Sequence, residues 1–76
     1  MDQKDEVLKK FGRYLTALRE EKKMTVQELA AATGFTSQKL RRIEAGEVDI
    51  LLSTVVTLSR GLDISPVMLL QSLDPD

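Results

Sequence analysis

The sequence of 76 residues contains no cysteine and no histidine. It therefore has no disulfide framework and no thiolate ligands, and it lacks the commonest general base and metal ligand of proteins. No apolar run exceeds four residues, which is too short to cross a membrane, and the charged N-terminus does not resemble a signal peptide. We expect a cytoplasmic protein that is not an enzyme and binds no cofactor or metal.

Charge is nearly balanced over the chain, at a net −1, but it is unevenly distributed. Residues 9–42 contain nine basic and three acidic groups, whereas residues 43–76 contain one basic and six acidic groups. A local basic patch, rather than the overall balance, decides whether a protein attracts a polyanion. With 42% hydrophobic residues, the composition is that of an ordinary globular chain, and the length predicts one domain over residues 1–76.

The hydrophobic pattern predicts an all-α fold of five short helices, because no segment shows a sustained period of two. The first is expected from Asp5 to about Lys22. Start and stop signals place the others at residues 25–33, at 36–45, from Ser53 or Thr54 through Leu62, and from Pro66 to about Leu73. Gly61 is the weakest local match, since glycine inside a helix costs about 1 kcal/mol relative to alanine.

The helix predicted at residues 36–45 has a polar face without an acidic residue. If its core direction lies between Leu40 and Ile43, a rotation of about 100° per residue directs four side chains outward or to the edge of the outward face: Ser37, Gln38, Arg41 and Arg42. Arginine can donate two hydrogen bonds to guanine, and glutamine can pair with adenine. The same pattern is also typical of a solvent-exposed helix face, so the helix alone does not establish a nucleic-acid site.

The spacing around this helix fits a helix-turn-helix unit at about residues 25–45. From about Phe11 to Leu70 the chain resembles the Cro/C1 (XRE) class of phage-repressor regulators, in the segments LTALREEKKMTVQELAAATGF, SQKLRRIEAG and LSTVVTLSRGLDIS. The resemblance implies a lambda-repressor-like domain that regulates transcription by sequence-specific binding of double-stranded DNA. As in phage repressors, the third helix would enter the major groove and the second would lie across the backbone.

The resemblance also implies roles for individual residues. Arg19 and Glu44 match charged family positions that pair with one another, so we expect a partly buried ion pair that orients the recognition helix. The candidates for DNA-backbone contacts are Thr25, Gln27, Thr36, Lys39, Arg13, Lys22 and Lys23.

The chain departs from the family pattern at places where a phosphate contact is expected. Val26 stands where family members often have a glutamine that helps to hold a phosphate. The following loop, often basic in the family, contains Glu47 and Asp49. These departures remove phosphate contacts and add repulsion, so we expect a shallow dependence of DNA binding on salt.

The C-terminal helices, at residues 53–73, contain more apolar residues than their inward faces can bury. Residues 67–70 are all apolar and point in four directions about 100° apart, so at least one of them faces outward. Such a patch usually marks an interface. We expect a homodimer that reads a palindromic operator, through a surface made of Val48, Ile50, Leu51, Met68 and Leu69. Alternatively, the C-terminal segment folds over this patch and covers it.

A second hypothesis is a protein-interaction module, such as an antitoxin or another regulatory partner, that keeps the fold with weak or no DNA binding. Val26, Glu47, Asp49 and the acidic C-terminal half favour it. A salt titration of binding to random duplex DNA distinguishes the two. Catalysis is disfavoured because the carboxylates are scattered and no nucleophile–base set exists.

Overall fold

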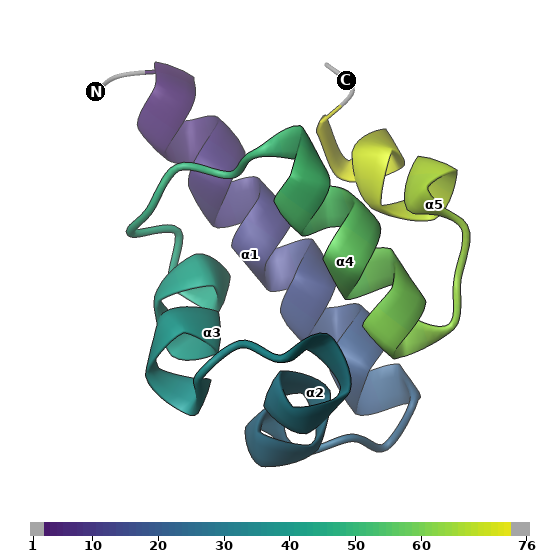
Figure 1. The fold of residues 1–76 in the computed structure, drawn as a ribbon. Coiled ribbons are helices and arrows are strands. Elements are labelled where there is room, and N and C mark those ends of the chain that lie inside the picture. Colours follow the sequence, from purple (N-terminus) through teal and green to yellow (C-terminus); the bar gives the residue numbers. More distant parts are fainter. Residues whose placement is uncertain (1–2, 74–76) are drawn as a thin grey trace.

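The computed structural model describes residues 3–73, which form five α-helices and a final short 3-10 helix (Figure 1). The α-helices are α1 (Gln3–Glu21), α2 (Val26–Thr33), α3 (Ser37–Glu44), α4 (Leu52–Leu62) and α5 (Pro66–Leu70), and the 3-10 helix is η1 (Gln71–Leu73). The described residues contain no strand, so the predicted all-α fold is confirmed. None of these helices is both long and apolar enough to span a bilayer.

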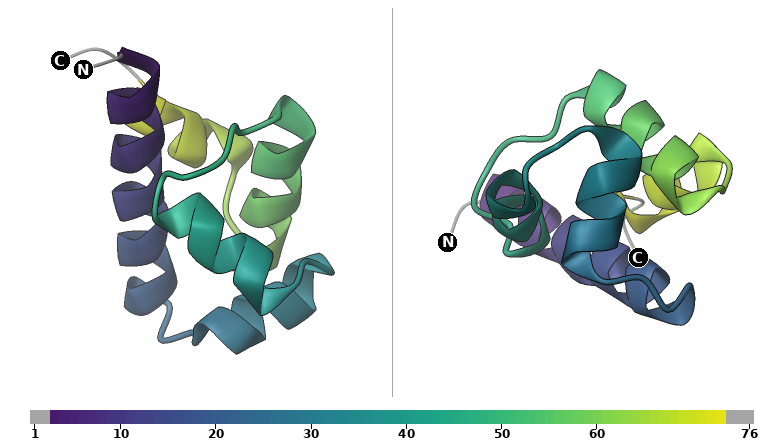
Figure 2. Two further views of the ribbon diagram at one scale, coloured as in Figure 1. Left: turned by 90° about the vertical axis from the view of Figure 1, so that its left-hand side faces the viewer. Right: turned by 60° about the horizontal axis from the view of Figure 1, so that its bottom comes forward.

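α1 runs along the length of the molecule, and the other helices lie on one side of it (Figures 1 and 2). α3 packs against α1, while α2 contacts both α3 and α4. α5 packs on α4, and η1 returns to α1. As a result, the N-terminal turn of α1 and the end of η1 lie at the same end of the molecule, away from α2.

One apolar core holds the five α-helices together. Its buried side chains are Phe11, Leu15, Leu18, Leu29, Ala30, Leu40, Ile43, Val55, Leu58, Leu62 and Leu69. Each of the five α-helices contributes at least one of them, so packing in the shared core stabilises every α-helix. Leu40 and Ile43, the residues used above to orient the third helix, both face this core.

Side-chain caps are present at three of the predicted helix starts. Thr25 and Glu28 form a reciprocal capping box, with the Glu28 amide donating to Thr25 Oγ1 at 3.0 Å and the Thr25 amide donating to Glu28 Oε1 at 2.8 Å. Thr36 Oγ1 accepts from the Lys39 amide at 3.0 Å. Ser65 caps α5, and a proline occupies the first turn of that helix. Local side-chain chemistry therefore sets these boundaries.

The remaining boundaries differ in part from the predictions. α1 begins at Gln3 rather than Asp5, and α4 begins at Leu52 rather than Ser53 or Thr54. The N-cap of α4 is Leu51, which makes no side-chain capping bond. Val48 and Ile50 in the preceding loop are half-buried against the core, so packing rather than a polar cap sets the start of α4. At the other end, α5 stops at Leu70, and the 3-10 helix covers the rest of the predicted helix.

Gly61, the weakest match in the sequence, has a packing role. A Cβ atom at this position would lie 2.7 Å from Thr33 Cγ2 and 3.1 Å from Leu29 Cδ1. Glycine therefore allows α4 to approach α2 closely, and this contact offsets its low helix propensity.

Candidate nucleic-acid interface

The turn between α2 and α3 has the geometry of a helix-turn-helix unit. α2 ends at Gly34, which adopts a left-handed conformation with φ of 80° and donates its amide to the carbonyl of Ala30 at 2.9 Å. The Phe35 amide donates to Thr33 Oγ1 at 3.3 Å, and Thr36 then caps α3. These local bonds define a three-residue turn between α2 and α3, which pack against each other, and Ala30 and Leu40 are among the buried side chains of the two helices.

Arg19 connects α1 to both ends of this unit. Its Nε donates to Glu44 Oε2 at 2.8 Å, and its Nη2 donates to Glu44 Oε1 at 3.2 Å. Its Nη1 donates to the carbonyl oxygen of Met24, just before α2, at 2.7 Å. Both charged side chains are only 11% exposed. The hydrogen bonds that the Arg19 guanidinium group donates to the Glu44 carboxylate raise the pKa of Arg19 above its usual value. The expected ion pair is present in the structure, with the bidentate geometry that favours Arg–carboxylate pairs.

The four side chains predicted to read bases differ in their exposure on α3. Gln38, Arg41 and Arg42 are exposed, whereas Ser37 is half-buried at the edge of the face. Because the core side of α3 is occupied by Leu40 and Ile43, the exposed side carries two guanidinium groups and an amide without a carboxylate. Such a surface has donors for the major-groove edges of guanine and adenine.

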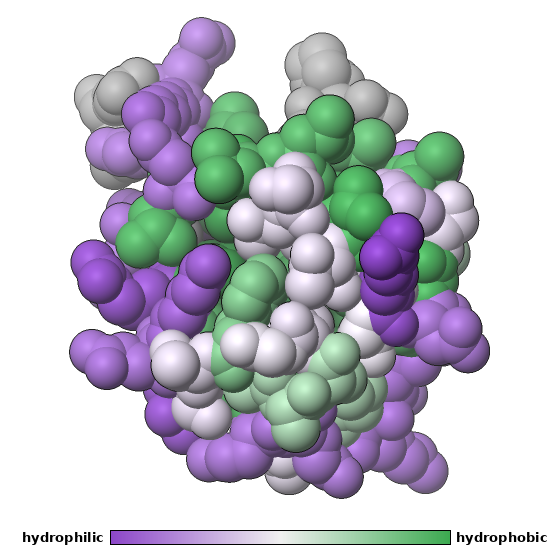
Figure 3. Space-filling model, in the orientation of Figure 1, coloured by the Kyte–Doolittle hydropathy of each residue, from purple (hydrophilic) through white to green (hydrophobic). Residues whose placement is uncertain are grey.

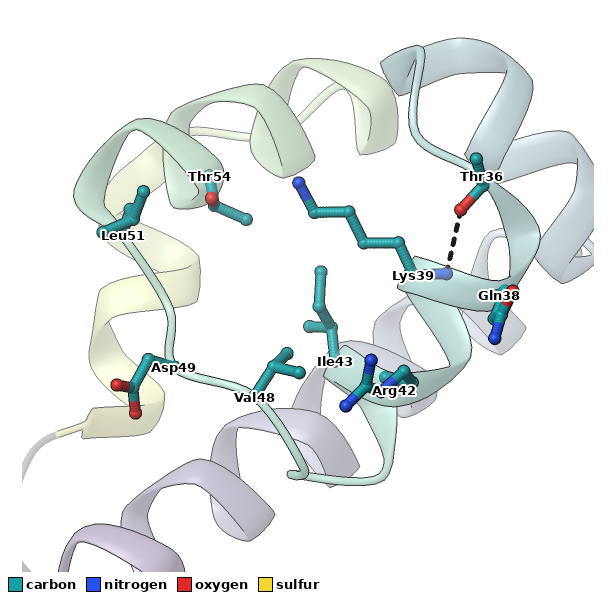
Figure 4. Close-up of a pocket in the computed structure, with 9 residues that line it drawn as sticks. All are labelled: Thr36, Gln38, Lys39, Arg42, Ile43, Val48, Asp49, Leu51 and Thr54. Atoms are coloured by element: carbon teal, nitrogen blue, oxygen red, sulfur yellow. Dashed lines mark hydrogen bonds between the residues drawn. The ribbon is translucent and has the colours of Figure 1, made fainter.

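An open groove of about 390 Å³ lies beside this face, between α3 and the start of α4 (Figure 4). Its lining residues are Thr36, Gln38, Lys39, Arg42, Ile43, Val48, Asp49, Leu51 and Thr54. Lys39 points from α3 across the groove, and its Nζ lies 4.3 Å from the centre of the Phe35 ring. A cation held over an aromatic ring is partly restrained, so Lys39 has to leave this contact in order to reach a phosphate on the outward face.

The backbone candidates occupy several separate parts of the surface. Gln27, Lys22 and Lys23 are exposed near the start of α2, whereas Arg13 is exposed on α1. The hydroxyl oxygens of the two threonines among the candidates, Thr25 and Thr36, accept capping bonds. A hydroxyl group that accepts such a bond retains its own proton for donation, which suits a phosphate oxygen.

The five residues predicted to form a dimer surface differ in their exposure. Leu69 is fully buried, so its assignment to this surface is wrong, because α5 turns this side chain towards the core. Leu51 is 67% exposed and Met68 is 39% exposed, while Val48 and Ile50 are half-buried.

Sequence reasoning missed the two most exposed apolar neighbours of this patch. Leu52 is 69% exposed at the start of α4, and Val67 is 60% exposed in α5. Hydrophobic side chains gather on the upper part of the face seen in Figure 3. The sequence indicated that the C-terminal helices contain more apolar residues than they can bury. Which of these residues are exposed depends on how α4 and α5 pack together.

Two further contacts around the site were not predicted from the sequence. Gly12 of α1 is buried directly against the backbone of Ile43 and Glu44 at the end of α3. Lys4 Nζ lies 3.0 Å from Asp49 Oδ1 in the loop that follows α3. Both contacts join α1 to the region of the recognition helix over long sequence distances.

Comparison with known proteins gives consistent matches to one family. The model of a helix-turn-helix domain matches residues 10–71. An uncharacterized HTH-type transcriptional regulator, y4dL of Sinorhizobium fredii, is 36% identical over 61 residues, which are 80% of this chain but only 31% of that relative. The chain thus spans about a third of that protein's length.

Solved structures show the same arrangement of helices. The restriction-modification controller protein C.AhdI from Aeromonas hydrophila is 32% identical, with a TM-score of 0.79 over 82% of this chain and 94% of that one. The clp gene regulator ClgR from C. glutamicum has a TM-score of 0.82 at 22% identity, over 88% of this chain and 87% of that one, which shows a shared fold. The chain therefore belongs to the helix-turn-helix domain family and has the fold of Cro/C1 (XRE)-type transcriptional regulators.

Proposed function

We propose that this domain binds double-stranded DNA sequence-specifically by placing α3 in the major groove. The observation that supports this function best is the exposed face of α3, where Gln38, Arg41 and Arg42 lie together without an acidic residue. Arg19 and Glu44 hold that helix against α1, and Thr36 caps its N-terminus. Ser37 and Gln38 are at the N-terminal end of α3, the end that contacts base edges in this type of docking.

In this proposal, cationic and polar groups around α2 contact the phosphates. Lys22, Lys23 and Gln27 are exposed beside the start of α2, and Thr25 offers a hydroxyl proton. Val26, which is half-buried and apolar, offers no such contact. The number of phosphate contacts is therefore small. Base contacts have to supply a larger share of the affinity, and the affinity for DNA depends only weakly on salt concentration.

We also propose that the protein acts as a homodimer on a palindromic operator. Leu51, Leu52, Val67 and Met68 are exposed apolar side chains just before and at the start of α4 and in α5, on a domain whose other large apolar side chains are mostly buried. Burying these side chains against a second copy removes them from water and doubles the number of base contacts. Sedimentation equilibrium tests this part, and a protein that remains monomeric at tens of micromolar contradicts it.

Selection of binding sites from a random duplex pool tests DNA recognition and symmetry together. We expect an enriched site with two inverted half-sites about one helical turn apart. Enrichment of a single half-site contradicts the palindrome. If no sequence is enriched and no duplex binds at low salt, the fold serves as a protein-interaction module instead.

The enriched site then allows a direct test of the reading face, which is the exposed surface of α3 formed by Gln38, Arg41 and Arg42. Arg42→Ala is expected to lose about 1–3 kcal/mol on the selected site and to relax the base preference at one position. Lys22→Ala is the matched control, because it removes an exposed cation at the assigned phosphate contact and weakens all duplexes alike. Equal losses on selected and random DNA for Arg42→Ala contradict a base-reading role.

A further inference from the structure

The first two turns of α1 lie outside the family match, which begins at residue 10, yet they contact the loop that follows the recognition helix. A Cβ atom on Gly46 would lie 2.7 Å from Lys9 Cα, so the loop begins directly against the α1 backbone. Three residues later, the Asp49 carboxylate pairs with Lys4 Nζ at 3.0 Å. Two points of contact therefore fix this loop to the N-terminal part of α1.

Asp49 also lies across the groove from Arg42, a residue of the exposed α3 surface that is proposed to read bases. Asp49 and Arg42 line the same groove, and Lys39 lines it as well. Figure 4 shows Val48 between Asp49 and Arg42, with the Asp49 carboxylate directed away from Arg42. Val48 and Ile50 are half-buried on either side of the exposed Asp49. The carboxylate is thus on the outside of the loop, where Lys4 is its partner.

We propose that Lys4 is a positioning residue for sequence discrimination: by holding the Asp49 carboxylate beside α1, it leaves Arg42 free to contact a base. This role rests on the proposed DNA-binding function. The planar guanidinium group of arginine presents the same pair of donors to a carboxylate and to guanine, so an Asp49–Arg42 pair would compete directly with base reading. The acidic loop residue is then compatible with DNA binding as long as α1 holds it.

The expected size of the effect follows from the exposure of the pair. The Lys4 and Asp49 side chains are 61% and 64% exposed, and ion pairs of this kind shift an equilibrium by about twofold to fivefold. Loss of Lys4 therefore lowers the affinity for the selected site by about that factor for each half-site. Random duplex DNA offers no specific partner to Arg42, so its affinity changes less.

A double-mutant cycle on the full chain tests this role. The affinities of wild type, Lys4→Gln, Asp49→Asn and the double variant are measured for the selected site and for random duplex at one low salt concentration. We expect Lys4→Gln to reduce the ratio of selected-site to random affinity by about twofold to fivefold per half-site, and to leave that ratio unchanged in the Asp49→Asn background. Lys4→Arg, which keeps the charge, is expected to retain the wild-type ratio.

Each other outcome has a distinct meaning. If Lys4→Gln weakens selected and random DNA by the same factor, Lys4 contributes only its long-range charge and the positioning role is refuted. A fall in the ratio that is equally large in the Asp49→Asn background also refutes it, because Asp49 is then not the mediator. If the wild-type protein binds no duplex at all, the proposed function fails and the role of Lys4 fails with it. If the wild-type protein binds the selected site but the effects of Lys4→Gln and Asp49→Asn are independent of each other, only the role of Lys4 is overturned.

Discussion

Replacement of Gly12 by alanine is expected to destabilise the protein, although the same change in an ordinary helix stabilises it. Gly12 lies in the middle of α1, where glycine costs about 1 kcal/mol relative to alanine. A Cβ atom there would overlap the Glu44 carbonyl oxygen, and it would lie 2.7 Å from the Glu44 carbonyl carbon and 2.8 Å from the Ile43 carbonyl oxygen. These are backbone atoms of α3 and cannot move aside as a flexible side chain would.

The magnitude follows from two opposing contributions. Forcing an extra methyl group into a well-packed contact costs about 1–3 kcal/mol, and three backbone atoms at close range place this site at the upper end. After the gain of about 1 kcal/mol in helix propensity, a loss of about 2 kcal/mol remains. For a domain of this length, that loss corresponds to a fall in Tm of roughly 8–16 °C.

Thermal and urea denaturation followed by circular dichroism measure this loss. Ala17→Gly, on the exposed side of the same helix, is the matched control and isolates the propensity contribution of about 1 kcal/mol. If Gly12→Ala is as stable as the wild type or more stable, α1 and α3 do not approach each other as closely as the structure shows. In that case the placement of the recognition helix has to be revised.

Two further substitutions test the supports of the helix-turn-helix unit. Glu44→Ala leaves Arg19 without its carboxylate partner, and we expect the free energy of unfolding to fall by about 3 kcal/mol. This is the lower end for a broken buried pair, because both side chains keep 11% exposure. A melting temperature no lower than that of Gln3→Ala would show that the pair does not stabilise the fold. Lys23 has a φ of 59° in the turn before α2, so Lys23→Gly is expected to stabilise the protein by about 0.5–1 kcal/mol. Lys22→Gly, at a neighbouring position without positive φ, is expected to lower the melting temperature, and a lower melting temperature for Lys23→Gly would contradict strain at that residue.

The parts of the fold that the sequence predicted well are those set by short-range chemistry. Thr25 and Glu28 are three residues apart, and Ser65 precedes a proline, so these helix starts can be read locally. Leu40 and Ile43 were sufficient to orient α3, because a helix has a fixed rotation per residue. The Arg19–Glu44 pair was expected only from the family resemblance.

The parts that the sequence did not predict depend on contacts between distant segments. In α5, four consecutive apolar residues give no preference for one direction, and the burial of Leu69 follows from how α5 packs on α4. The role of Gly12 depends on the position of α3, about thirty residues later in the chain. The exact partner of Asp49 depends on the path of α1 beside the loop. The functional roles of the reading and phosphate residues remain predictions for the experiments above.

The three hydrogen bonds of Arg19 have a consequence for the thermodynamics of recognition. They connect α1, the turn before α2 and the end of α3, so the reading helix is already ordered in the free protein. Binding by such a preorganised surface requires little loss of conformational entropy, and it lacks the large heat-capacity change of coupled folding and binding. A rigid surface also adapts poorly to an altered site. Discrimination between operators therefore comes from contacts that are lost outright, rather than from rearrangement of the protein around a different base sequence.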